Sequence, residues 1–372
     1  MAKDTETILL LQGGGALGSY QGGVYEELAA CGARVDWVAG MSIGAINAAI
    51  IAGNPPEKRV EKLNDFWARM SQSVVLETFE SPAFPRMWSD HANAAWIAAF
   101  GIPGFFVPRI PPPQLQPPGT LAAISVYDTT SLRRTLEEHA DFERINSGET
   151  RLSVGAVNIK SGNFAYFDNA KQKIGPEHVM ASGALPIGFP PVEIDGEYYW
   201  DGGLVSNTPL QYVMEVRDAG TPATIFQVDL FSARGDVPQT LTDAAEREKD
   251  IRYSSRTRLN TDDARRNQEL GQALERLARK LPEALRDDPD VRMLAQFHAR
   301  SMTPIAIVHL IYRAKLHETD SKDYLFSRSA MQDHWAAGRA DVHRSLKDPR
   351  WTGRDPARPG MTIYDLTRED GR

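Results

Sequence analysis

The stretch "RVDWVAGMSIGAINAAI", residues 34–50, places a serine between two glycines, where one apolar run ends and another begins. The first run is short enough for a buried strand, and the second is long enough for an apolar helix. A strand, a sharp turn and a helix in this order form the setting in which a Gly-x-Ser-x-Gly turn exposes a serine hydroxyl for nucleophilic attack. We therefore take Ser42 as a candidate nucleophile and Gly40 and Gly44 as the glycines that permit its turn.

The segments around this stretch repeat the same order of elements. The apolar run Ile8–Leu11 ends in three glycines, and Tyr20, Val24 and Leu28 then recur at helical spacing. Later apolar runs and hairpin signals, such as Asp195-Gly196, indicate further short strands. Short strands that alternate with helices predict an α/β fold built on a mainly parallel sheet.

Composition narrows the class of protein. The 372 residues carry a net charge of −7, which argues against a nucleic-acid partner, because phosphate contacts normally need a basic surface. Cys31 is the one cysteine, so neither an intrachain disulfide nor a cysteine-rich zinc site is expected. The N-terminus lacks the pattern of a signal peptide, and no apolar run has the length of a membrane span. We expect a cytoplasmic protein, and contact with a membrane surface stays open.

The glycine-rich stretch "LQGGGALGSYQGG", residues 11–23, has two interpretations. The amides of Gly13, Gly14 and Gly15 could point to one side and form an oxyanion hole. The same letters also match a dinucleotide fingerprint, with Asp36 near the distance of a ribose-binding acid. In that fold the acid ends the second strand, whereas here the strand continues past Asp36 into the serine turn. A P-loop is excluded because no Gly-Lys-Ser/Thr follows.

A general base is required if Ser42 is a nucleophile. Asp201 in "YYWDGGLVSN" closes a hairpin strand before two glycines, so its carboxylate could project toward a neighbouring loop. An ordinary Asp-Gly turn would give the same letters. An aspartate near its usual pKa of ~3.9 is a weak base, so the mechanism would need coupled capture of charge by the glycine amides.

A serine, aspartate and histidine triad is the alternative arrangement. His317 follows the last strand-like run and His309 lies within it, so the chain order of an α/β-hydrolase is satisfied. Such a fold places several strands before its nucleophile, but only two short strands precede Ser42. We expect His178, His309 and His317 to be structural.

Residues 80–125 interrupt the regular pattern with many prolines and clustered apolar side chains. A long irregular segment of this kind inside a domain commonly covers a functional site. Trp96, Phe105 and Phe106 are therefore candidates for contact with an acyl chain, and ordinary packing on the core is the competing interpretation.

Three of these motifs together resemble the patatin-like phospholipase family, over roughly residues 7–232. "GGGALG" is similar to its oxyanion loop, "GMSIG" to its nucleophile motif and "DGG" to its aspartate motif, in the family's order. By position, the resemblance implies Ser42 as nucleophile, Asp201 as base and Gly13 to Gly15 as the oxyanion loop. Many members carry Arg or Lys where this chain has Leu17, so it lacks that cation.

The same resemblance implies a three-layer α/β/α fold with a mainly parallel central sheet. Residues 1–232 would form the catalytic domain, and residues 233–372 a mostly helical C-terminal extension with one late strand, packed on that domain. The implied activity is hydrolysis of lipid carboxylic esters through an acyl-enzyme, without metal or cofactor. Two other functions stay open: a catalytically idle lipid-binding protein of the same fold and a nucleotide-dependent oxidoreductase.

Overall fold

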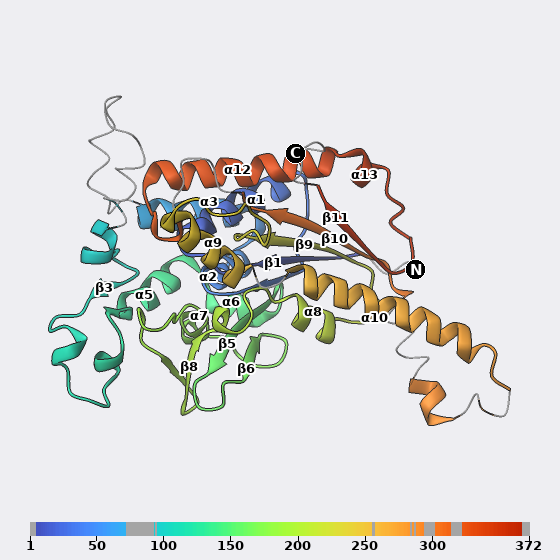
Figure 1. The fold of residues 1–372 in the computed structure, drawn as a ribbon, viewed down its shortest axis with the longest axis horizontal. Helices are drawn as coiled ribbons and strands as arrows, with labels where there is room; N and C mark the ends of the chain where they lie inside the picture. Colours follow the sequence, from blue (N-terminus) through green and yellow to red (C-terminus); the bar gives the residue numbers. More distant parts are fainter. Residues whose placement is uncertain are drawn as a thin grey trace.

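The computed structural model describes residues 5–71, 93, 95–254, 257–282, 285, 288–293, 302–313 and 322–366. Figure 1 shows a central sheet with helices on both of its faces and a strongly curved segment, labelled β3, that projects from one end. No helix within these residues has the length and apolar character needed to cross a bilayer.

The central sheet is mainly parallel, as the sequence predicts. Its strand order is β11-β10-β9-β1-β2-β5-β8-β7, with β6 also paired to β5. Every pair from β11 to β5 is parallel, and the pairs that β5 forms with β6 and β8 are antiparallel. The strands of this sheet are β1 (Glu6–Leu11), β2 (Trp37–Gly40), β5 (Arg151–Asn158), β6 (Phe164–Asp168), β7 (Val192–Ile194), β8 (Glu197–Asp201), β9 (Ala223–Asp229), β10 (Ile305–Ile311) and β11 (Met361–Asp365).

Helices cover both faces of the sheet, which confirms the three-layer arrangement. On one face, α1, α2, α3 and α12 pack against one another, and α8 covers part of the other face. The α-helices are α1 (Gly18–Ala30), α2 (Ile43–Ala52), α3 (Pro56–Ser71), α5 (Thr130–His139), α6 (Phe142–Ser147), α7 (Pro176–Ser182), α8 (Leu210–Val216), α9 (Leu241–Tyr253), α10 (Thr257–Ala278), α12 (Arg328–Lys347) and α13 (Pro349–Thr352).

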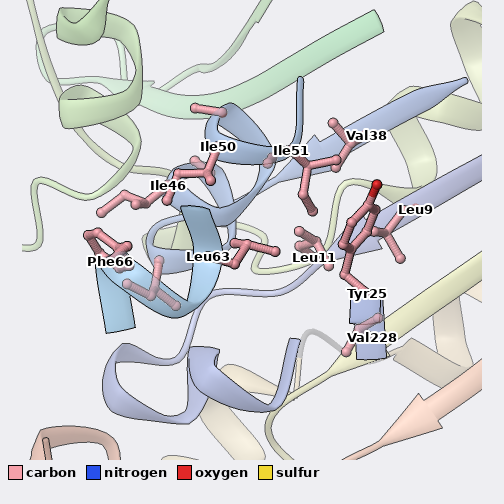
Figure 2. Close-up of a cluster of buried hydrophobic side chains, with 14 of the residues drawn as sticks. Leu9, Leu11, Tyr25, Val38, Ile46, Ile50, Ile51, Leu63, Phe66 and Val228 are labelled. Atoms are coloured by element: carbon pink, nitrogen blue, oxygen red, sulfur yellow. The ribbon is translucent and has the colours of Figure 1, made fainter. Parts of the chain in front are cut away.

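The alternation of side chains along β1 explains why both faces need a cover. Leu9 and Leu11 belong to the larger core, with Ile46, Leu63 and Phe66 of the neighbouring helices (Figure 2). Ile8 and Leu10 point to the other face and belong to the core beneath α8. Because all four side chains are fully buried, this strand lies in the centre of the molecule.

Local sequence signals correctly predicted several turns. Helix α1 ends before Gly32, which adopts a positive φ of 77°. The β7–β8 hairpin turns at Asp195 and Gly196, which have φ values of 51° and 79° as a type I′ turn requires. Gly162, also at positive φ, lies in the connection between β5 and β6.

The C-terminal residues contribute to the same sheet. The predicted late strand is β10, and it pairs with β9. Beyond it the structure adds β11, a second strand whose half-buried residues follow a proline and a glycine and therefore give no strand pattern in the sequence. Helix α12 packs along α1, and Tyr20 of α1 donates a 2.8 Å hydrogen bond to Asp341 of α12.

The contact between α1 and α12 depends on glycine. A Cβ atom added at Gly338 of α12 would overlap the carbonyl oxygen of Tyr20, and one added at Gly23 of α1 would overlap that of Trp335. The two helix backbones therefore approach closely only because neither position carries a side chain.

We predict that Gly338→Ala lowers the free energy of unfolding by about 1–3 kcal/mol, because the added methyl group pushes the two helices apart. Helix propensity alone would give a gain of about 1 kcal/mol, so the two effects have opposite signs. Urea unfolding followed by circular dichroism measures the change, with Ala336→Gly on the exposed side of α12 as the propensity control. A Gly338→Ala protein more stable than the wild type would contradict the packing argument.

Candidate active site

The serine turn joins β2 to α2 with a strained backbone. Ser42 has φ 53° and ψ −123°, a conformation that is costly for any residue with a side chain. A Cβ atom at Gly40 would overlap the carbonyl of Gly44, and one at Gly44 would overlap that of Leu11. The turn therefore requires glycine at both flanking positions. The Ser42 amide donates a 3.0 Å hydrogen bond to the hydroxyl of Ser182.

Asp201 reaches the serine turn through the register of three strands. Gly40 at the end of β2 pairs with Val154 of β5, and Ala156, two residues further along β5, pairs with Asp201 at the end of β8. This register brings the two segments to the same edge of the sheet, although Ser42 and Asp201 are 159 positions apart in the chain.

The environment of Asp201 changes its acidity. The residue is only 2% exposed, and burial raises the pKa of its carboxyl group to about 6. A 2.7 Å hydrogen bond from the Gly203 amide opposes that rise in pKa, and so does the nearby hydroxyl of Ser42. The Asp201 carboxylate is thus desolvated, and the Gly203 amide is its hydrogen-bond donor.

The glycine-rich loop lies against the serine turn. A Cβ atom at Gly13 would stand 2.9 Å from the Cβ of Ser42. The Gly13 amide, however, already donates to the Oδ1 atom of Asn207 at 3.1 Å, and the Asn207 amide donates back to the Gly13 carbonyl at 3.0 Å. Gly13 is therefore bound on both sides, and in this arrangement its amide is not a free oxyanion donor.

The amides of Gly14 and Gly15 differ from that of Gly13. Within the described part of the chain, neither donates a hydrogen bond to another protein group. Gly15 adopts a positive φ of 55°, and a Cβ there would overlap the backbone carbonyl of Asp323. Two of the three predicted oxyanion donors, the amides of Gly14 and Gly15, thus remain available. The third, the Gly13 amide, is bound by Asn207. The sequence offers no periodic or motif signal for Asn207.

All these groups line one cavity of about 330 Å³. Ser42, Asp201 and the three glycines form one part of its wall, and apolar side chains form most of the rest. Phe105 and Phe106 line it as predicted, and the ring of Phe189 packs tilted against both of theirs. Trp96 is not among the lining residues, and its ring packs at a tilt against that of Phe100 instead. Of the predicted segment 80–125, residues 80–92 and 94 lie outside the described residues.

The C-terminal residues close another side of the cavity. Lys249 of α9 forms a 2.8 Å ion pair with Asp323, and both line the cavity together with Tyr253, Tyr324 and Phe326. The backbone carbonyl of Tyr253 also accepts a hydrogen bond from the side chain of Asn207, at 3.0 Å. Sequence reasoning missed this wall because none of these residues belongs to a recognisable motif.

The alternatives from the sequence do not fit this site. His309 is buried on β10, His178 accepts a 2.9 Å hydrogen bond from the Gly175 amide, and His317 lies outside the described residues. No described histidine lines the cavity of Ser42. Asp36 precedes β2 and accepts a hydrogen bond from the Thr7 amide, so it lies at the opposite edge of the sheet from the glycine loop and could not hold a ribose there.

Two family profiles match the sequence. One described as patatin-like phospholipase matches residues 9–214, more than half of the chain, and one described as patatin phospholipase matches residues 251–358. The chain belongs to the patatin-like phospholipase family. Membership of this family supports a lipid esterase activity, and the second match covers most of the C-terminal extension.

Three solved structures of low identity are similar to this chain. VipD from Legionella pneumophila is 15% identical with a TM-score of 0.40, over 91% of this chain and 66% of its own. Human GIVD cytosolic phospholipase A2 is 12% identical with a TM-score of 0.36, over 60% and 43%. ExoU of Pseudomonas aeruginosa, solved with SpcU, is 16% identical with a TM-score of 0.28, over 93% and 72%. The chain thus spans less than two thirds of the VipD chain and of the human phospholipase chain. No match was found among the curated proteins.

We predict that the free energy of unfolding of the Asp201→Asn variant, relative to that of the wild type, increases as the pH rises from 4 to 7. In the folded protein the Asp201 pKa is about 6 rather than 3.8, so the folded state holds this proton more tightly than the unfolded chain does. Wild-type stability therefore falls across this window, by about 2 kcal/mol relative to the amide variant. Urea unfolding at several pH values measures the difference, and a difference that does not change with pH would refute a buried carboxyl group of raised pKa.

Proposed function

We propose that the protein is a serine acyl hydrolase that cleaves carboxylic esters of lipids, of the phospholipase A or lysophospholipase type. The observation that carries the proposal is that the strained Ser42 and the buried Asp201 line the wall of the same largely apolar cavity, with the serine hydroxyl near enough to lower the carboxyl pKa. Family membership supports the same class of reaction.

The acylation step uses the two side chains in turn. The Ser42 hydroxyl oxygen attacks the acyl carbonyl carbon while the Asp201 carboxylate takes the hydroxyl proton. The negative charge that develops on the carbonyl oxygen is stabilised by the amides of Gly14 and Gly15. As the C–O bond to the alcohol breaks, Asp201 returns the proton to the leaving oxygen, and the acyl group stays on Ser42.

Deacylation repeats these steps with water. Asp201 takes a proton from the water that attacks the acyl carbon, and then returns it to Ser42 as the acid leaves. A pKa near 6 suits this role, because such a carboxylate is mostly ionised at neutral pH and is still a stronger base than an exposed aspartate. The apolar side of the cavity, with Phe105 and Phe106, would receive the acyl chain.

Ser42→Ala is expected to abolish turnover of short-chain p-nitrophenyl esters, because the nucleophile is lost while the turn keeps a small side chain. Release of p-nitrophenol measures the rate, and circular dichroism checks that the fold is retained. Turnover at the wild-type rate in this variant would rule out the proposed nucleophile. Failure of wild-type Ser42 to react with a fluorophosphonate probe would instead indicate a catalytically idle lipid-binding protein.

Asn207→Ala is expected to lower kcat by roughly 10- to 100-fold with little change in KM, since a displaced catalytic loop mainly weakens transition-state contacts. Asn207 is a positioning residue in this proposal, because it holds Gly13 and thereby aims the next two amides. Steady-state kinetics on the same esters separates the two constants. A rise in KM with unchanged kcat would instead assign Asn207 to ground-state substrate binding.

A further inference from the structure

The projecting segment around β3 (Val107–Pro108) and β4 (Tyr127–Asp128) exposes an unusual number of large apolar side chains. Ile110 is 94% exposed and Leu115 is 73% exposed, and neither contacts a core cluster. Exposed apolar groups are common singly, but a contiguous set marks an interaction surface. We call this set the apolar lip; it consists of Phe100, Val107, Ile110, Leu115, Ile124 and Val126, together with Ile187.

The apolar lip is the outer face of the wall that lines the cavity. Phe106 and Tyr127 point into the cavity, whereas their neighbours Val107 and Val126 are exposed on the outside. The Val126 amide donates to the carbonyl of Ile187 at 3.1 Å, which ties the lip to a residue that lines the cavity and is also 74% exposed. The lip therefore surrounds part of the cavity mouth.

The lip has little capacity for charge attraction. Residues 100–127 contain one charged side chain, Arg109. Its guanidinium is bound to Asp128 at 2.9 Å and to Ser125 at 3.0 Å, and only 14% of the side chain is exposed. Attraction to anionic lipids needs a cluster of exposed Lys or Arg near the surface. Residues 100–127 offer no such cluster.

The backbone of the lip is also suited to an apolar medium. Six of the eleven residues 108–118 are prolines, and proline has no backbone N–H group. In an apolar medium these residues therefore leave no N–H group without a hydrogen-bond partner. Gln116 in this stretch donates its side-chain amide to the carbonyl of Pro111 at 2.7 Å. Transfer of this segment out of water therefore costs less than transfer of an ordinary loop.

We propose that the apolar lip inserts into the interface of an uncharged lipid bilayer and sets the cavity mouth against it. The occupant is a lipid surface rather than a protein because the lip is continuous with the cavity wall, and because the proposed acyl-ester substrate, on which this inference rests, would enter there. Binding is driven by burial of apolar surface and not by charge.

The test measures co-sedimentation with vesicles, using Ser42→Ala protein so that no lipid is consumed. Binding is expected to vesicles of phosphatidylcholine alone, with a change of less than about twofold when phosphatidylserine or salt is added, since little charge attraction contributes. Binding that requires phosphatidylserine and disappears at high salt would overturn the proposal.

The lip variant carries Ile110→Asp and Leu115→Asp. Its matched control is Leu277→Asp, at a 60% exposed residue of α10, a helix that lies on the opposite side of the molecule from β3 (Figure 1). The lip variant is expected to lose at least about tenfold in vesicle partitioning, because two apolar side chains become charged. The Leu277→Asp control should bind vesicles as well as its parent, the Ser42→Ala protein.

Hydrolysis of a soluble short-chain ester separates this inference from the proposed function. With Ser42 intact, the lip variant should keep the wild-type rate on that ester, since neither substituted residue lines the cavity. Unchanged vesicle binding by the lip variant would refute the proposed role of the apolar lip in membrane binding. Dimers seen by sedimentation and broken by the same two substitutions would refute it as well, in favour of a second copy of the chain. Absence of ester hydrolysis by the wild-type protein would refute only the proposed hydrolase activity.

Discussion

The desolvated carboxylate of Asp201 is the constraint on which the rest of the site depends. Burying an ionised group is costly unless polar partners compensate, and the Gly203 amide and the Ser42 hydroxyl both act to keep the carboxyl group ionised. Both partners must therefore be held rigidly. The register of β2, β5 and β8 provides this rigidity, because it joins the two segments through backbone hydrogen bonds rather than through flexible side chains.

The C-terminal extension is structurally part of this arrangement. It supplies β10 and β11 to the sheet, lays α12 against α1, and brings the carbonyl of Asp323 against Gly15. Because Tyr253 accepts a hydrogen bond from Asn207, the extension also supports the residue that holds Gly13. The glycine loop is thus fixed from two sides, by groups that lie before and after α9 in the chain. This explains how a loop of three glycines keeps one conformation.

The cavity has two chemically different sides. Aromatic and aliphatic groups such as Phe105, Phe106 and Phe189 form one, and the ion pair of Lys249 and Asp323 with Tyr253 lies on the other. An ester with an apolar acyl chain and a polar alcohol matches this division. The apolar side continues into the exposed lip, whereas the polar side is closed by the extension, so the two sides differ in access to the surface as well as in chemistry.

The sequence by itself determined the strand-turn-helix at Ser42, the glycines around it, the hairpin before Asp201 and the parallel α/β class. These features follow from local backbone preferences and from the period of apolar residues, which neighbouring letters encode. Only the tertiary structure decided that the Asn207 side chain accepts a hydrogen bond from the Gly13 amide and that Lys249 and Asp323 close one side of the cavity. The burial that raises the pKa of Asp201 was likewise decided by the tertiary structure. Each of these depends on contacts between residues far apart in the chain, which no local pattern records.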